Sequence, residues 1–287
     1  MTNELVTIYI ISKNREPFLR RAISSCQNQT YQNLEIIVVD DCSDNFDIFS
    51  LQKDFPLVNF HRMEASSGAN ICRNKALSKA KGTYITGLDD DDLFTEDRIK
   101  KMLSVLNEKG VKAVSSRHLF ERVFHCYTFR DRVKFAIKKV SLIFPGKLIF
   151  SEDLLNKNIV GNQIFTQTSI LRKIGGFDVE LPALQDYETW LRFLIAIGPI
   201  YRVNDFLYIK NDETVSITNF NRKKLLGFDY IFNKYQDYFS GFEHCFSLHK
   251  KLYENKVLTF REVIRFWKKG NRVYLLKLML TLKVKGF

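Results

Sequence analysis

The sequence Gly82-Thr-Tyr-Ile-Thr-Gly-Leu-Asp-Asp-Asp-Asp92 is a strand-like run that ends in four consecutive aspartates. A helical pattern begins close behind it, near Glu96. Alternate side chains of an extended chain share a side, so Asp89 and Asp91 are expected to point together from the carboxyl end of the strand. Open α/β sheets bind their ligands at that end. Two carboxylates this close favour either protonation of one of them or a cation between them.

A divalent cation is one interpretation of the four aspartates. Mg²⁺ or Mn²⁺ suits one or two carboxylates and keeps coordination positions for water and phosphate oxygens. The other interpretation is a solvated acidic turn in which Asp92 or Thr95 caps the next helix. The run alone favours neither, and the rest of the chain has to decide.

Apolar strand-like segments alternate with helical segments before the aspartates. The strands are rich in β-branched residues and are apolar almost throughout, which suits burial on both faces. The alternation predicts a mostly parallel sheet with right-handed crossovers, flanked by helices. Residues 1–117 are therefore expected to form a nucleotide-binding half domain. The expected strands are 6–12, 34–40, 58–63, 82–88 and 112–117, and the expected helices are 15–28, 47–55 and 68–79.

The order of elements is less regular after residue 117. We expect residues 118–217 to form an acceptor-binding half, with a basic helical insertion at about 118–155, and residues 218–287 to form a basic helical extension. Within the second half the pattern predicts a strand at 161–171, a tight turn at 174–177, a helix from Tyr187, and two short strands at 200–203 and 206–210.

Composition limits the class of protein. A hydrophobic content of 45% with 26% charged residues is typical of a globular chain. The net charge is +12, and the excess is concentrated in residues 118–150 and 250–287. Five cysteines without metal-binding spacing predict free thiols in a reducing cytoplasm. No signal-peptide pattern and no apolar run of about 18 residues is present, so a cytoplasmic location is expected.

Two common phosphate-binding signatures are absent from the sequence, namely G-x-G-x-x-G and G-x-x-x-x-G-K-[ST]. Phosphates would then be held by a metal ion and basic side chains. Asp40 and Asp41 end the second strand, where a carboxylate can accept from a base or a ribose, or can cap a turn. Arg73 either projects towards the same edge, where a guanidinium fits a base or diphosphate, or is an exposed helix arginine.

Several of these segments together resemble family 2 glycosyltransferases of the GT-A fold. The resemblance runs from Val6 to about Ser216, with the motifs in the family's order. They are Val6-Thr-Ile-Tyr-Ile-Ile-Ser-Lys-Asn-Arg15, Arg21-Ala-Ile-Ser-Ser-Cys-Gln-Asn-Gln-Thr-Tyr31, Glu35-Ile-Ile-Val-Val-Asp-Asp-Cys-Ser-Asp44, Gly68-Ala-Asn-Ile-Cys-Arg-Asn74, Leu88-Asp-Asp-Asp-Asp92, Gly175-Gly-Phe-Asp178 and Leu184-Gln-Asp-Tyr-Glu-Thr-Trp-Leu-Arg192.

The resemblance implies roles at matching positions. Asp40 would bind the nucleobase, with the backbone near Asn14 beside it, and Arg73 would line the base or diphosphate pocket. Asp89 would hold the ribose or a metal-bound water. The chain departs from the family at three places. Ser66 lies where the family often has Asn, Cys72 lies where it often has Ala, and Gln185-Asp186 replaces its usual Glu-Asp pair.

The metal and the general base follow from the same resemblance. Asp91 would ligate Mn²⁺ or Mg²⁺ directly. Asp186 would take the proton of the acceptor hydroxyl, although it also fits the cap of the following helix. The implied reaction is an inverting, metal-dependent transfer from a nucleotide sugar, with UDP as the default. Lys210 either reaches the leaving diphosphate or is a surface lysine.

The basic, aromatic-rich stretches suggest partners. Amphipathic helices at 261–269 and 274–283 fit an anionic membrane interface, or pack on the catalytic domain with snorkelling lysines. The family's surface-polysaccharide members imply a glycan or polyprenyl- or lipid-linked acceptor, in O-antigen or lipopolysaccharide assembly at the inner face of the cytoplasmic membrane. Nucleic acid is not expected as a partner, because no nucleic-acid-binding motif is found.

Two other functions remain compatible with the sequence. A sugar nucleotidyltransferase would use similar metal chemistry, but it requires a Gly-rich phosphate loop after the first strand, and Ser12-Lys-Asn-Arg15 lacks the glycines. A non-catalytic carbohydrate- or membrane-binding scaffold of the same fold predicts that Asp186→Asn leaves function unchanged.

Overall fold

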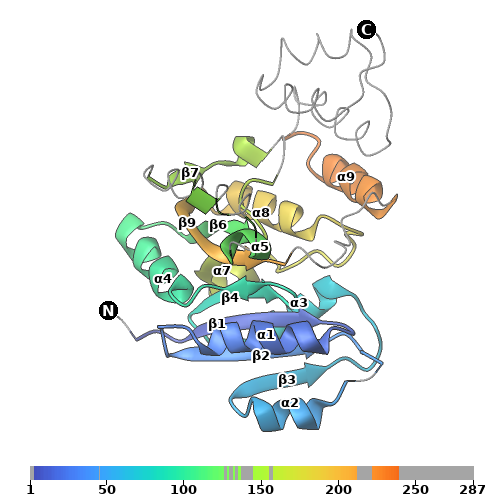
Figure 1. Ribbon diagram of the computed structural model, residues 1–287. Helices are drawn as coiled ribbons and strands as arrows, with labels where there is room; N and C mark the ends of the chain where they lie inside the picture. Colours follow the sequence, from blue (N-terminus) through green and yellow to red (C-terminus); the bar gives the residue numbers. More distant parts are fainter. Residues whose placement is uncertain are drawn as a thin grey trace. The chain divides into compact units, whose positions relative to one another are not determined.

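The computed structural model describes residues 3–44, 46–125, 128, 132, 135–136, 145–154, 158–211 and 222–238 (Figure 1). The chain divides into two compact units. The first comprises Met1–Leu154, Asn158–Val179 and Gln185–Ser216, and the second Leu155–Lys157, Glu180–Leu184 and Ile217–Phe287. In the described part of the second unit, helix α9 (Arg222–Lys234) is the regular element.

A mixed nine-stranded sheet forms the centre of the first unit (Figure 1). The strand order is β3-β2-β1-β4-β8-β6-β9-β5, and β7 pairs with β9 off this path. Strands β1 to β4 pair in parallel, as do β6 and β9, whereas β5, β7 and β8 run antiparallel to their neighbours. The strands are β1 (Val6–Ser12), β2 (Leu34–Asp40), β3 (Val58–Arg62), β4 (Tyr84–Asp89), β5 (Leu93–Phe94), β6 (Ala113–Phe120), β7 (Lys147–Ile149), β8 (Phe165–Gln167) and β9 (Ile200–Lys210).

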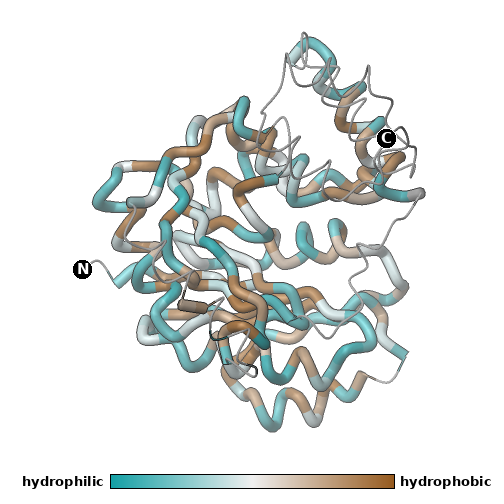
Figure 2. Tube along the Cα trace, turned by 45° about the horizontal axis from the view of Figure 1, so that its top comes forward, coloured by the Kyte–Doolittle hydropathy of each residue, from teal (hydrophilic) through white to brown (hydrophobic). Residues whose placement is uncertain are grey.

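Helices connect the strands and cover the sheet. Those of the first unit are α1 (Glu16–Gln27), α2 (Ile48–Asp54), α3 (Ala69–Lys79), α4 (Arg98–Lys109), α5 (Glu121–Phe124), the 3₁₀ helix η2 (Ser151–Leu154), α7 (Thr168–Lys173) and α8 (Gln185–Ala196). The main apolar core joins Ile8 and Ile10 of β1 to Ile23 of α1 and Met102 of α4, all of them fully buried. Figure 2 shows hydrophobic stretches along the interior of the trace and hydrophilic ones in many of the outer connections.

The structure confirms the alternating strands and helices predicted before residue 110, with boundaries that shift by at most two residues. The strand predicted at 112–117 continues to Phe120 as β6, which pairs with β9 from Val114 to Phe120. Part of the basic helical insertion predicted at about 118–155 lies outside the described residues. The described residues there include the end of β6, the four-residue α5, the strand β7 and the 3₁₀ helix η2, so residues 147–149 form a strand where a helix was expected. The helical extension after residue 238 lies outside them entirely.

Two predictions of the second half need correction. The returning strand expected at 161–171 is only the three residues of β8, because Thr168 donates its backbone N–H to the Thr83 carbonyl at 2.9 Å and α7 begins there. The two short strands expected at 200–210 are one strand, β9. The register changes from Ser116 opposite Val203 to Arg117 opposite Phe206, so a bulge lies where a break was predicted.

The parallel register determines where the polar strand ends lie. Ser12 of β1 is opposite Asp40 of β2, and Ile11 of β1 is opposite Asp89 of β4. The carboxyl ends of these three strands therefore meet at one edge of the sheet. Open α/β sheets bind their ligands at such an edge.

None of the helices in the described part of the chain combines the length and the apolar character that a bilayer crossing requires.

Candidate active site

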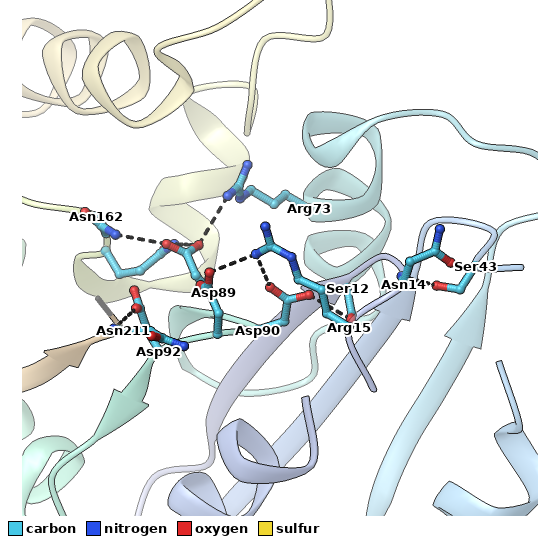
Figure 3. Close-up of polar contacts among 12 residues, drawn as sticks. Ser12, Asn14, Arg15, Ser43, Arg73, Asp89, Asp90, Asp92, Asn162 and Asn211 are labelled. Carbon is cyan, nitrogen blue, oxygen red and sulfur yellow. Dashed lines mark hydrogen bonds and ion pairs between the residues drawn. The ribbon is translucent and has the colours of Figure 1, made fainter. Parts of the chain in front are cut away.

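The four aspartates begin at the end of β4 and continue into a turn. Strand β4 ends at Asp89, and the backbone N–H of Asp92 donates to the Asp89 carbonyl at 3.1 Å. The extended geometry on which we based a shared side for Asp89 and Asp91 thus ends at Asp89. Asp89, Asp90 and Asp92 contact different groups (Figure 3).

Asp89 accepts hydrogen bonds from three side chains of distant segments. Asn162 Nδ2 lies at 2.9 Å, Gln163 Nε2 at 3.4 Å and the Arg73 guanidinium at 3.4 Å. Asn162 and Gln163 precede β8, whereas Arg73 lies on α3. The Asp89 carboxylate stays about a quarter exposed. It is thus oriented by donors and still open to a ligand.

Asp90 and Asp91 share the guanidinium of Arg15. One Arg15 nitrogen donates to Asp91 at 2.8 Å and to Asp90 at 3.3 Å. Asp90 also accepts from the Ser12 hydroxyl at 2.8 Å. Burial raises the pKa of Asp90 to about 6, although Ser12 and Arg15 oppose the shift.

Asp92 holds the turn to the end of β9. It accepts the backbone N–H of Asn211 at 2.8 Å, and the Tyr208 hydroxyl accepts the backbone N–H of Asp89 at 3.3 Å. Burial and the charge of Asp89 raise the pKa of Asp92 well above its usual range. These contacts give Asp92 a structural role, which differs from the helix cap considered above.

Arg73 is buried, which excludes the exposed-arginine interpretation. Its guanidinium lies 5.5 Å from the ring centre of Phe177. Its positive charge interacts with the carboxylates of Asp186 and Asp89. Two of its nitrogens, Nε and one terminal nitrogen, are buried without a hydrogen-bond partner among the described residues. A buried cation with unused donors is suited to an anionic ligand.

Asp186 lies in the first turn of α8, beside this cation. Its Oδ1 atom is buried without a hydrogen-bond partner in the part of the chain that the structure describes. Burial raises the pKa of Asp186 to about 7. Arg73 and Lys210 lower it, and Asp89 raises it. A carboxyl group with a pKa near neutrality is suited to general acid–base catalysis.

Lys210, at the end of β9, joins the same group. Its ammonium donates to Asn162 Oδ1 at 3.3 Å, and the amide nitrogen of Asn162 donates to Asp89. Lys210 therefore belongs to the site edge, which favours the first of the two interpretations considered for it.

Tyr9 and Gly87 fix the orientation of Gln163. The two residues are opposite each other on β1 and β4, and a Cβ at Gly87 would lie 2.4 Å from the Tyr9 ring. The buried Tyr9 hydroxyl donates to Gln163 Oε1 at 3.0 Å, which leaves the amide nitrogen to donate to Asp89. The glycine is required because the tyrosine ring occupies the space of its side chain.

The predicted turn at Ile174–Phe177 forms hydrogen bonds with side chains of both α3 and α8. Gly175 and Gly176 have φ values of 87° and 64°, which favour glycine. Asn74 of α3 donates to the Phe177 carbonyl at 2.7 Å and accepts the Phe177 N–H at 2.8 Å. Arg192 of α8 donates to the Gly176 carbonyl at 2.8 Å. The turn thus fixes the helix of Arg73 relative to the helix of Asp186.

A cavity of about 400 Å³ lies beside the aspartates, between the ends of β1 and β2. Asn14, with a φ of 55°, holds its wall through the pair of hydrogen bonds that its amide forms with Asp44. The Asn14 N–H donates to the Ser43 hydroxyl at 2.7 Å. The lining residues are Ser12, Asn14, Arg15, Glu16, Pro17, Ser43, Asp44 and Phe46.

Asp40 lies beneath this wall. Its carboxylate is fully buried and accepts the backbone N–H of Ser43 at 3.0 Å and the Ser43 hydroxyl. It therefore forms the turn cap that we had considered as its alternative role. Asp41 accepts the N–H groups of Ser67 and Gly68 at the start of α3.

The structure therefore brings together Arg73, Asp89 and Asp186, with Asp91 in the adjoining turn and Asn14 across the cavity. Sequence reasoning missed Arg15, Asn162 and Gln163. Arg15 stood within a quoted motif without a role. Asn162 and Gln163 fell within the strand predicted at 161–171, where their side chains were given no role.

Comparison with known proteins identifies the family of this chain. The sequence model of the family described as "Glycosyl transferase family 2" matches residues 7–174. A protein of Escherichia coli K12 named as a colanic acid biosynthesis glycosyl transferase, WcaA, is 33% identical over 273 residues, which cover 91% of this chain and 92% of the relative. A Bacillus subtilis protein named for teichuronic acid biosynthesis, TuaG, is 27% identical over 72% of this chain and 79% of its own.

Solved structures share the fold. Staphylococcus aureus TarS (residues 1–349) in complex with UDP-GlcNAc matches with a TM-score of 0.62 at 15% identity, over 97% of this chain and 76% of that one. The mannosyltransferase PcManGT of Pyrobaculum calidifontis, with GDP-Man and Mn²⁺, matches with a TM-score of 0.58 at 15% identity, over 96% and 78%. The fold is therefore the GT-A fold. With a family match across more than half of its length and a full-length relative, the chain belongs to glycosyl transferase family 2 and is a glycosyltransferase.

Proposed function

We propose that this glycosyltransferase moves a sugar from a nucleoside-diphosphate donor to a hydroxyl of a glycan or lipid-linked acceptor, with inversion at the anomeric carbon. The observation that carries the proposal is the buried, unpartnered oxygen of Asp186 beside Arg73. A base and an anion-binding cation thus lie together at the ligand edge of the sheet.

The donor base fits the cavity between the ends of β1 and β2, where Asn14 lines the wall. Asp40 acts through Ser43 rather than by direct contact, because its carboxylate is fully buried. UDP is our first choice of nucleotide, since TarS was solved with UDP-GlcNAc. GDP is the second, since PcManGT was solved with GDP-Man.

Asp91, together with Asp89, would hold Mn²⁺ or Mg²⁺. The described residues contain no group of three or more His, Cys, Asp or Glu side chains arranged to hold a metal by themselves. This fits an ion bound by one or two carboxylates and the donor's phosphates, which is the usual arrangement for Mg²⁺. When bound, the ion would neutralise the charge of the departing diphosphate.

The residues of the chain account for the rest of the step. Asp186 takes the proton of the acceptor hydroxyl, whose oxygen forms a bond to the anomeric carbon. The bond from that carbon to the diphosphate oxygen breaks on the opposite face, and the nucleoside diphosphate leaves with the electron pair. Arg73 and Lys210 supply positive charge beside Asp186, which keeps a larger fraction of it ionised.

The acceptor class rests on the relatives. WcaA and TuaG are named for the biosynthesis of colanic and teichuronic acids, so we infer a role in bacterial polysaccharide assembly. Attachment to an anionic membrane surface through the basic helices predicted after residue 250 is part of the same proposal. A peripheral position would bring the enzyme to a lipid-linked acceptor.

The test compares wild type with Asp186→Asn. Donor binding is measured by calorimetry with UDP- and GDP-sugars and Mn²⁺, and turnover by release of nucleoside diphosphate in the presence of bacterial glycolipids. We expect unchanged donor affinity and a turnover at least about 100-fold lower in the variant, because general base catalysis contributes 10²–10⁴-fold. Equal turnover in both proteins would mean that a group other than Asp186 acts as the base.

A further inference from the structure

Arg15 lies against Asp91, one of the two carboxylates at which the proposed function places a metal ion, and against its neighbour Asp90. One of its guanidinium nitrogens lies 2.8 Å from Asp91 and 3.3 Å from Asp90. The same side chain lines the cavity of about 400 Å³ that we assign to the donor nucleotide. Figure 3 shows Arg15 approaching Asp90 from the segment that follows β1, while Arg73 approaches Asp89 from α3.

A purely structural role explains this ion pair poorly. The Arg15 side chain is 26% exposed and that of Asp91 is 17% exposed, and in a mostly buried pair the cost of desolvating both charges offsets much of their attraction. Asp90 already has a hydrogen bond from Ser12. What the guanidinium does supply is positive charge where four consecutive carboxylates repel one another.

We propose that Arg15 is an exchangeable counter-ion. It holds Asp91 and Asp90 while the donor is absent, leaves Asp91 when a divalent cation arrives with the nucleotide, and then binds the diphosphate. A guanidinium is suited to both partners, since it matches carboxylate and phosphate oxygens with the same donors. The inference rests on the proposed function, because it needs a nucleotide and a metal at this edge.

Exchange makes a prediction that a fixed ion pair does not. Removing the guanidinium removes a competitor for Asp91, so the protein alone should bind a divalent cation more tightly. The same change removes a phosphate ligand, so the nucleotide should bind more weakly. The two affinities must move in opposite directions.

The experiment measures Mn²⁺ binding to the protein alone by electron paramagnetic resonance, and UDP and GDP binding at saturating Mn²⁺ by calorimetry. For Arg15→Met we expect a several-fold tighter Mn²⁺ affinity and a nucleotide affinity weaker by about 10-fold or more. Arg15→Lys keeps the charge and should leave the Mn²⁺ affinity near that of wild type. Arg21→Met, which removes an α1 arginine paired with Glu121 away from the cavity, is the matched control and should change neither affinity.

An unchanged or weaker Mn²⁺ affinity in Arg15→Met overturns the exchange, and an unchanged nucleotide affinity overturns the diphosphate contact. If Arg15→Met does not fold, Arg15→Gln replaces it with the same expectations. Failure of the wild type to bind either nucleotide is a different result, because it contradicts the proposed function itself.

Discussion

Asp186 combines a buried carboxylate oxygen with charged neighbours on three elements, namely Arg73 on α3, Asp89 at the end of β4 and Lys210 at the end of β9. Its pKa is about 7. The proposed base must be ionised, so kcat/KM, which reports the free enzyme, should rise with pH through an apparent pKa near 7. A pH profile of the wild type tests this. A profile that is flat between pH 5 and 8, or that falls with pH, would exclude an unprotonated Asp186 as the base.

Arg73 sets the position of that profile. Its cation lowers the pKa of Asp186 against the effect of burial. In Arg73→Met the carboxylate loses this stabilisation, so we expect the midpoint of the kcat/KM profile to move to higher pH. Arg21→Met, which removes an α1 arginine paired with Glu121, should leave the midpoint where it is. An identical midpoint in wild type and Arg73→Met would contradict the electrostatic account.

At the scale of elements, the turn at Ile174–Phe177 determines how α3 and α8 are held. Gly176 has a φ of 64°, and a Cβ there would lie 2.5 Å from Asn74 Oδ1. Gly176→Ala should therefore lower the free energy of unfolding by about 1 kcal/mol, because alanine disfavours the left-handed conformation that glycine adopts readily. It should lower it further by disturbing the Asn74 hydrogen bonds.

Gly110 provides a matched control for this substitution. It follows α4 with a φ of 62°, and its Cβ position is open. Gly110→Ala should cost only the backbone preference. Denaturant unfolding of the two variants should thus show the larger loss of unfolding free energy for Gly176→Ala, and equal losses would mean that Asn74 does not hold the turn.

Elements that depend on distant partners were the ones that sequence reasoning misjudged. The strand pattern at 161–171 was apolar enough for a strand, but α7 starts at Thr168, whose hydroxyl donates to the Gly82 carbonyl. In β9 the polar residues Asn204 and Asp205 suggested a break, whereas pairing with β6 carries the strand through them as a bulge. The local sequence pattern indicates burial and secondary-structure propensity, but it does not indicate which distant strand a segment pairs with.

At the scale of the whole molecule, the mostly parallel sheet and its ligand edge could be predicted, because each of the first strands is a continuous apolar run that ends in polar residues. The family resemblance predicted roles for Asp89, Arg73 and Asp186, which lie together in the structure, and these roles stay proposals. The partners of Asp89 could not be predicted, since Asn162 and Gln163 lie 73 and 74 residues away in the sequence. Their role depends on the antiparallel pairing of β8 with β4.

The most direct test of a donor site at this edge is a thermal-unfolding panel of UDP, GDP and dTDP, with Mn²⁺ or with EDTA. It compares wild type, Asp91→Asn and, as a control for an exposed carboxylate, Glu96→Gln. A ligand at 100 times its dissociation constant adds about 2.7 kcal/mol, which raises Tm by several degrees. We predict that one nucleotide stabilises wild type and Glu96→Gln only with Mn²⁺, and that Asp91→Asn loses the effect. Absence of stabilisation by every nucleotide, or equal stabilisation of Asp91→Asn, would contradict the proposed donor site.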